Sequence, residues 1–368
     1  MFGQSIVSHF SHLRWRAKRQ RPDLHTAWAQ RQRLPGWVQA SPLAQRYLEL
    51  LGPLAWDRLP ERNLVRHWGQ PTVPYAAFIP ACLIKLHEGR KSFGDLRVLL
   101  AEHPALVWLL GFPQVVSYPA RPGGDADASL PTARHLTRML RALPNAVLQF
   151  LLTDSVRLIR EELRRHQVVV GECISVDTKH ILAWVKENNP KAYVEDRYAK
   201  TRQLKGDADC KLGCKRRHHR PHAGSEPEPA STPTRNPIPA SAQSVGEFYW
   251  GYGSGIVVTR VPGWGEFVLA ELTQTFDQAD VSYFFPLMTA TEQRLGFRPR
   301  FATFDAAFDA WYVYAYFHRD DDPDAFAAVP FVEKGGYKAR QFSPEGLPIC
   351  AAGLPMPLRF TYTDRTTC

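Results

Sequence analysis

The sequence predicts an all-helical N-terminal region followed by an α/β domain with a mixed sheet and a disordered insertion. Three patterns lead to this prediction. Apolar residues recur at spacings of three and four from about residue 40 to residue 168, as in amphipathic helices. After residue 168, runs rich in β-branched residues alternate with helical runs. Residues 205–245 begin with basic side chains and continue with Pro, Ser and Ala, a composition too poor in apolar residues to pack.

The composition favours a globular protein with a polyanionic partner. With 368 residues and 44% hydrophobic content, the chain can bury one large core or form two domains of ordinary size. The 46 basic and 36 acidic residues give a net charge of +10, which favours nucleic acid over a membrane surface. No run of about eighteen apolar residues occurs, so we expect no membrane partner. The six cysteines are scattered, as is typical of a protein in a reducing cytoplasm.

Residues 1–39 are predicted to form a basic N-terminal arm. Aromatic residues lie among its charges, and several of its basic residues are arginines. Two interpretations remain open from the sequence: a solvated tail that binds nothing, and an arm that lies over DNA phosphates.

Residues 40–168 are predicted to be a helical domain. Ser41 followed by Pro42 is typical of a helix start, because a serine hydroxyl caps free backbone N–H groups and proline tolerates the first helical position. Ser92 is a second candidate cap, and Pro144 marks a break between two helices. No helix-turn-helix signature occurs, so DNA binding and dimerisation are both left open as roles for this domain.

Residues 169–349 are predicted to be the α/β domain. A first strand-like run is "QVVVGECISVDTKHILAWV", and later two such runs flank the turn signal "PGWG" to make a β-hairpin. The stretch "ADVSYFFPLMTATEQRLG" predicts a helix, "RPRFATFDAAFDAWYVYAYFHR" a strand, an acidic turn and a helix, and "AFAAVPFVEKGG" another strand. A hairpin followed by alternating helices and strands predicts a mixed sheet.

Two aspartates are the strongest candidates for chemistry. Asp177 follows "CISV" and Asp305 follows "FATF", so each is expected at the end of an apolar strand, where α/β sheets collect ligands. Two adjacent carboxylates repel each other unless a cation lies between them, and their hard oxygens select Mg²⁺ or Mn²⁺. The alternative is a pair of unrelated turn aspartates. Asp309 is the weaker candidate, because it does not come directly off the strand.

Five segments in order resemble the DDE-type insertion-sequence transposases of bacteria. They are "SVDTKHI", "GDADCKLGCKRR", "YWGYGSGIVVTRV", "FATFDAAFD" and "SPEGLPICAAGLPM", and the resemblance extends over roughly residues 90–368. It implies an RNase H-like catalytic domain in which Asp177 and Asp305 match the first two catalytic acids. It also implies metal-dependent cleavage of transposon ends, joining of their 3′-hydroxyls to target DNA, and a homo-oligomer on the DNA.

The resemblance further requires a third acid, which the sequence does not identify. The family signature is Tyr–x2–Arg–x3–Glu–x6–Lys, and Tyr337 and Arg340 match its first two positions. Glu345 comes one residue late, in a predicted turn, and Glu333 lies in a predicted strand. Residues 350–368 resemble the start of a cysteine-bearing insertion that precedes the glutamate in relatives. We therefore expect a truncated transposase in which strand cleavage is absent or very slow. The alternatives are an inactive DNA-binding remnant and a stand-alone metal-dependent nuclease.

Basic residues near the first acid and in the insertion are predicted to contact DNA phosphates. They are Lys179, Lys211, Lys215, Arg216, Arg217 and Arg220, with His180 as a further candidate beside Asp177.

Cysteines and histidines in the insertion offer a competing interpretation as a Zn²⁺ site. The residues are Cys210, Cys214, His218, His219 and His222. Their spacing departs from that of zinc sites, so a basic loop that contacts phosphates is preferred. Cys350 and Cys368 could be half of a zinc ribbon, but alone they would bind nothing tightly.

Overall fold

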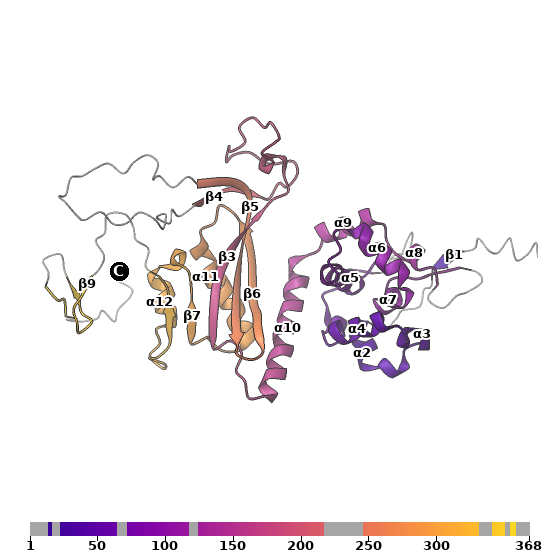
Figure 1. Cartoon of the computed structure of the whole chain (residues 1–368), viewed down its shortest axis with the longest axis horizontal. Coiled ribbons are helices and arrows are strands. Elements are labelled where there is room, and N and C mark those ends of the chain that lie inside the picture. The colour runs from indigo at the N-terminus through magenta and orange to yellow at the C-terminus, as the bar shows by residue number, and fades with distance from the viewer. Residues whose placement is uncertain are drawn as a thin grey trace, which may run out of the picture. The chain divides into compact units, whose positions relative to one another are not determined.

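The computed structural model describes residues 14–16, 23–64, 72–117, 124–216, 246–330, 341–349 and 354–357. Within these residues the protein is a mixed α+β structure, as predicted (Figure 1). None of its helices combines the length and the hydrophobicity needed to cross a membrane, as far as the described residues go.

The described N-terminal part of the chain is helical apart from one pair of short strands (Figure 1). They are α2 (Leu24–Ala29), η1 (Arg31–Arg33), α3 (Gly36–Gln39), α4 (Pro42–Leu51), η2 (Trp56–Arg58), α5 (Tyr75–His87), α6 (Phe93–Glu102), α7 (Pro104–Leu109), α8 (Ala126–Ser129), α9 (Ala133–Arg141) and α10 (Asn145–Arg165).

The helix starts predicted from capping residues are confirmed. Ser41 precedes α4, and its hydroxyl accepts a hydrogen bond from the backbone N–H of Ala44 at 3.4 Å. Ser92 precedes α6 and forms a reciprocal capping box with Asp95, in which each side chain accepts from the other residue's N–H. Pro144 precedes α10 and separates it from α9, because proline is favoured just before or at a helix start.

The structure differs from the predicted N-terminal arm within residues 23–39. This stretch forms α2, η1 and α3, and its apolar residues are buried in the core of the helical region. Leu24, Ala27 and Val38 are at most 2% exposed. The physical reason is that apolar residues three or four apart make one face that can be buried, and this stretch contains only two arginines, Arg31 and Arg33. Residues 14–16 form strand β1 (Arg14–Arg16), which pairs antiparallel with β2 (Val115–Ser117).

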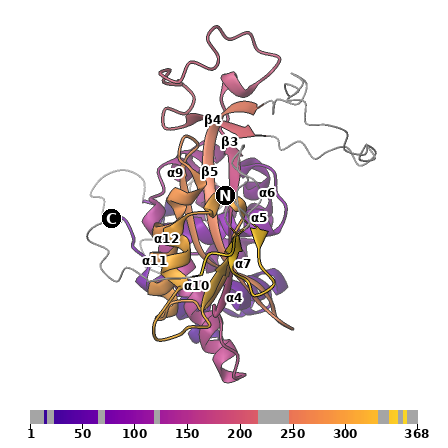
Figure 2. The same ribbon diagram turned by 90° about the vertical axis from the view of Figure 1, so that its left-hand side faces the viewer.

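A mixed sheet of six strands follows the helical region (Figure 1, Figure 2). The strands are β3 (Cys173–Leu182), β4 (Lys211–Arg216), β5 (Gly246–Val261), β6 (Gly265–Thr275), β7 (Phe301–Thr303) and β8 (Phe326–Ala328). The order across the sheet is β4, β5, β3, β7, β8, with β6 also paired to β5. Strands β4 and β5 are antiparallel and β7 and β8 are parallel, which confirms the mixed sheet.

The predicted hairpin and helices of the sheet region are confirmed. Strands β5 and β6 flank the turn at "PGWG", where Gly263 adopts a positive φ of 80°. The later elements are η5 (Asp280–Tyr283), α11 (Phe284–Leu295), η6 (Ala306–Phe308) and α12 (Trp311–Phe317). Strand β8 covers three residues of the last predicted strand; residues 325, 329 and 330 are described but are not part of a strand, and residues 331–336 lie outside the described part.

Part of the predicted insertion is ordered. Residues 211–216 form strand β4 rather than a loop, because Leu212 is buried and β5 offers a pairing edge. Residues 183–210, between β3 and β4, fold over a small hydrophobic core of their own, which includes Val185, Leu204 and Trp250. Residues 217–245 lie outside the described part of the chain.

The chain divides into two compact units. The first comprises residues 1–174, 256–271 and 287–299, and the second residues 175–255, 272–286 and 300–368. Strands β3, β5 and β6 and helix α11 have residues in both units. The two aspartates predicted to form the site, Asp177 and Asp305, belong to the second unit.

Candidate functional site

Strand β3 presents Asp177 on an exposed face. Ile174 and Val176 are buried, whereas Ser175, Asp177 and Lys179 are exposed, because successive side chains in a strand point to opposite faces. The strand prediction is confirmed, but the expected position of Asp177 at a strand end is wrong. β3 continues to Leu182, and Asp177 lies in its middle. The exposed side avoids the cost of burying a lone carboxylate.

The loop after β7 holds Asp305. Phe304 is buried, and Asp305 follows it as the N-terminal cap of η6. Its carboxylate accepts a hydrogen bond from the backbone N–H of Ala307 at 3.0 Å. β7 ends at Thr303, so Asp305 lies two residues beyond the strand, near its predicted position but not directly after it.

A side-chain hydrogen bond links the two strands that lead to these aspartates. The Thr303 hydroxyl of β7 donates to the Ser175 hydroxyl of β3 at 2.8 Å, and the two strands are neighbours in the sheet. Asp177 and Asp305 each come two residues after one of these hydroxyl residues. Residues 128 positions apart in the sequence are thus brought together.

The surroundings of Asp305 disfavour the charged form of its carboxyl group. Its side chain reaches solvent, yet the protein packed around it raises the pKa of the carboxyl group by desolvation. The negative charges of Asp280 and Asp177 raise this pKa further, and the hydrogen bond from Ala307 lowers it. The two predicted aspartates therefore lie close enough for their charges to interact.

Asp280 is a third carboxylate at this site that the sequence interpretation missed. It begins η5, a short 3₁₀ turn that lies in contact with η6. The turn is held by Tyr283, which is buried and whose hydroxyl donates to the carbonyl of Gly253 in β5 at 2.8 Å. A side chain at position 253 would collide with the Tyr283 hydroxyl, so only glycine admits this contact. The acidic stretch "FDQAD" is the sequence feature that could have pointed to Asp280, but such a stretch is also typical of an ordinary helix start.

The donor chemistry of the site suits a hard divalent cation. Carboxylate oxygens are preferred by Mg²⁺, which in proteins is commonly bound by one or two carboxylates together with water and substrate phosphates. A cation would also offset the mutual repulsion that raises the pKa of Asp305. In the described part of the chain, no three His, Cys, Asp or Glu side chains form a group that could hold a metal ion by themselves. The pair therefore fits Mg²⁺ or Mn²⁺ with substrate or water as further ligands.

The other candidate acids have different surroundings. Asp309 accepts a hydrogen bond from the Tyr314 hydroxyl at 3.0 Å, which supports the start of α12. Desolvation first, and then this hydrogen bond and the charge of Asp309, raise the pKa of Tyr314 to about 12. Glu345 lies in the exposed turn between β9 (Gln341–Phe342) and β10 (Pro348–Ile349), as predicted. Glu333, Tyr337 and Arg340 lie outside the described residues.

The basic residues predicted to contact DNA are placed in part. Lys179 shares the exposed side of β3 with Asp177, and Lys211 is exposed on β4. His180 instead packs against the ring of Phe276, with 4.3 Å between ring centroids. The backbone of Lys215 and Arg216 belongs to β4, and their side chains lie outside the description, as do Arg217 and Arg220 entirely.

The two described cysteines of the considered zinc site have different surroundings. Cys210 is buried in the small core between β3 and β4, and its thiol donates to the Asp207 carbonyl at 3.2 Å. Burial first, and then the charges of Asp207 and Glu187, raise the pKa of the thiol to about 11, which disfavours the thiolate that binds zinc. Cys214 is exposed on β4. His218, His219, His222, Cys350 and Cys368 lie outside the described residues.

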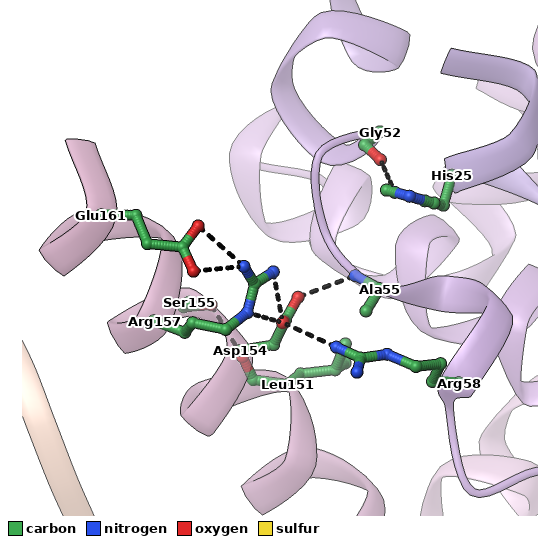
Figure 3. Close-up of polar contacts among 9 residues, drawn as sticks. All are labelled: His25, Gly52, Ala55, Arg58, Leu151, Asp154, Ser155, Arg157 and Glu161. Carbon is green, nitrogen blue, oxygen red and sulfur yellow. Dashed lines mark hydrogen bonds and ion pairs between the residues drawn. The ribbon is translucent and has the colours of Figure 1, made fainter. Parts of the chain in front are cut away.

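A second polar cluster, on α10, is structural. Asp154 is 4% exposed and accepts a hydrogen bond from the backbone N–H of Ala55 at 2.7 Å (Figure 3). Arg157 lies 2.8 Å from the same carboxylate and also pairs with Glu161, while Arg58 lies 3.9 Å away (Figure 3). Every oxygen of Asp154 thus has a partner within the fold, and none is directed to a ligand.

Comparisons of the chain with protein-family models, with curated proteins and with solved structures find no match. The function must therefore be inferred from the chain's own residues.

Proposed function

We propose that the protein is a DDE-type transposase whose RNase H-like domain uses a divalent metal ion to cleave and join DNA strands, and that cleavage is very slow because the family's third acid is not identified in this chain. The observation that carries the proposal is the meeting of Asp177 and Asp305. Asp177 lies on β3 and Asp305 in the loop after the neighbouring strand β7, and the charge of Asp177 raises the pKa of Asp305. Repelling carboxylates at a surface are costly unless they serve a cation, and perturbed acids gather at functional sites.

Each residue would have a defined part in the reaction. Asp177 and Asp305 would hold Mg²⁺ or Mn²⁺, and Asp280 would add negative charge that favours the cation. Lys179, exposed on the same side of β3 as Asp177, would contact a DNA phosphate beside the metal. The ion would polarise the phosphodiester and lower the pKa of a bound water or hydroxyl. The net charge of +10 would attract DNA, in a cytoplasmic, nucleoid-associated setting and as a homo-oligomer.

Nicking of supercoiled plasmid by the purified chain tests this proposal. Nicking should require Mg²⁺ or Mn²⁺, and Asp177→Asn and Asp305→Asn should each reduce it by roughly a hundredfold or more, since even outer-shell changes at metal sites cost about 10- to 100-fold. Asp320→Asn removes an equally exposed aspartate outside the site and should leave nicking unchanged. Asp177→Cys should retain activity with Mn²⁺ but lose it with Mg²⁺, because a thiolate is a poor ligand for Mg²⁺.

A second candidate is a protein of the same fold that binds DNA without cutting it. It is favoured by the lack, among the described residues, of a three-residue group that could hold a metal ion. This candidate predicts salt-dependent DNA binding with no metal-dependent nick in wild type or variants. Metal-dependent nicking that is lost in Asp177→Asn would rule out this DNA-binding candidate. Such nicking without strand joining would support a stand-alone nuclease, whereas nicking with strand joining would support the transposase.

A further inference from the structure

The segment between β3 and β4, residues 183–210, leaves a tryptophan entirely in solvent. Trp184 is 100% exposed, although its two neighbours Ala183 and Val185 are both 7% exposed. An indole ring usually buries a large apolar area, so full exposure at an ordered position indicates a partner.

The backbone on both sides of Trp184 is fixed. The N–H of Ala183 donates to the carbonyl of Trp250 at 3.0 Å. The side-chain amide of Asn188 donates to the carbonyls of Ala183 and Trp250 at 2.8 and 2.7 Å, and its oxygen accepts from the Trp250 N–H at 2.9 Å. The small core of this segment buries Val185 and Trp250. Hydrogen bonds and packing therefore hold the backbone that carries the Trp184 ring.

Exposed lysines flank the ring. Lys186 lies two residues after Trp184. A Cβ added at Gly206 would lie 3.7 Å from the Trp184 carbonyl oxygen, so the backbone next to exposed Lys205 lies close to the backbone of Trp184. Among the described residues neither lysine forms an ion pair, whereas the nearby Glu187 is paired with Arg202 at 3.6 Å. Residues 183–210 hold six basic and five acidic side chains, a net charge of +1, and of the acids nearest Lys205, Asp207 accepts a hydrogen bond from the Tyr252 hydroxyl at 2.7 Å.

Other exposed aromatic rings lie on the same segment or beside it. Tyr193 is 86% exposed, and Tyr198 is 55% exposed with its ring 6.0 Å from that of Phe248. Aromatic rings among unpaired lysines are the composition of surfaces that stack bases and neutralise phosphates.

We propose that this segment is a platform for single-stranded DNA, on which Trp184 stacks against a base while Lys186 and Lys205 contact the adjacent phosphates. The choice of DNA as the polymer rests on the proposed function. Bases inside a duplex are already stacked on each other, so an exposed indole gains most from unpaired bases. A protein partner fits less well, because lysines are depleted from protein interfaces.

Fluorescence anisotropy with a labelled single strand of mixed sequence tests the proposal. Titrations in EDTA would compare this strand with an abasic strand of equal length, which keeps the phosphates but lacks bases. Trp184→Ala should weaken binding of the intact strand by roughly five- to a hundredfold and leave the abasic strand unaffected. Trp184→Phe should retain most of the affinity. Trp264→Ala, on the β5–β6 turn, is the matched control for an exposed indole and should bind as wild type does.

The two lysines are tested by the salt dependence of the binding affinity. Lys186→Ala with Lys205→Ala should lower the slope of log affinity against log salt by about 0.7 for each lost phosphate contact, with both intact and abasic strands.

Four results would overturn the platform: equal affinity of Trp184→Ala and wild type, an equal loss on the abasic strand, tighter binding of the matched RNA, or a Trp184-dependent dimer in sedimentation. The proposed function is tested apart from it. Asp177→Asn should keep the Trp184-dependent binding, so failure to nick plasmid and failure to stack bases are separate outcomes.

Discussion

At the scale of single residues, Asp305 combines two properties that conflict in a protein without ligand. Its carboxylate caps η6, which favours the charged form, yet burial and the charges of Asp280 and Asp177 raise its pKa overall. An acid with a raised folded-state pKa binds its proton more tightly in the native state than in the unfolded chain. Its contribution to stability is therefore present in acid and lost as pH rises through the folded-state pKa.

Asp305→Asn should accordingly stabilise the metal-free protein while it abolishes function. The amide keeps the capping interaction and has no charge to repel Asp280 and Asp177. Because solvent screens part of this repulsion, the expected gain is on the order of 0.5 kcal/mol at pH 7, and it should shrink as pH falls toward about 4. Urea unfolding in EDTA across this pH range checks it. A clear loss of stability at pH 7 would show that the charge of Asp305 is stabilising and that the site is not strained.

At the scale of elements, the position of Asp280 depends on how η5 packs on β5. Tyr283 is fully buried against Gly253, and the hydrogen bond between them fixes the turn that begins with Asp280. Gly253→Ala should push Tyr283 outward and cost about 1–3 kcal/mol of unfolding free energy, the usual range for overpacking. Gly36→Ala, in α3 with open space around its Cα, should be neutral or stabilising in the same urea titrations. Equal effects of the two substitutions would contradict the packing described for Tyr283.

Helix α10 carries a buried carboxylate whose removal should be far more costly. Asp154→Ala leaves the backbone N–H of Ala55 without its partner and Arg157 without one of two, so we expect a loss of about 3 kcal/mol. Glu162→Ala breaks an exposed pair with Arg165 on the same helix and should cost less than about 0.5 kcal/mol. Thermal unfolding of both variants measures the difference. A similar small loss in both would mean that Asp154 is not a structural acceptor.

Elements with a local signal could be predicted from the sequence, and those that depend on distant contacts could not. Ser92 and the "PGWG" turn mark α6 and the β5–β6 hairpin because caps and turns act within a few residues. The helices at residues 23–39 were missed because the basic residues of 14–33 suggested one continuous arm, although the stretch itself holds only Arg31 and Arg33 against four buried apolar residues. Strand β4 was missed because its pairing edge on β5 comes 35 residues or so later in the chain.

At the scale of the whole molecule, local sequence signals predicted one part of the candidate site, whereas contacts between distant residues determine the other part. Asp177 and Asp305 were found because each follows a strand-like run, although the length of β3 beyond Asp177 was not foreseen. Asp280 could not be found, since its place depends on the contact of Tyr283 with Gly253, 30 residues away. Sequence patterns report burial and local geometry, whereas the convergence of charges from three segments is a property of the folded sheet.

The central claim is that acids far apart in the chain bind one metal ion, and iron-directed cleavage of the protein tests it most directly. Fe²⁺ bound in place of Mg²⁺, with ascorbate and peroxide, cuts the backbone near its ligands. The account predicts cuts beside residues 177 and 305 in the same molecules, suppressed by excess Mg²⁺ and lost together in Asp177→Asn or in Asp305→Asn. Cuts at one position that survive substitution of the other aspartate, or no cuts at either, would contradict it.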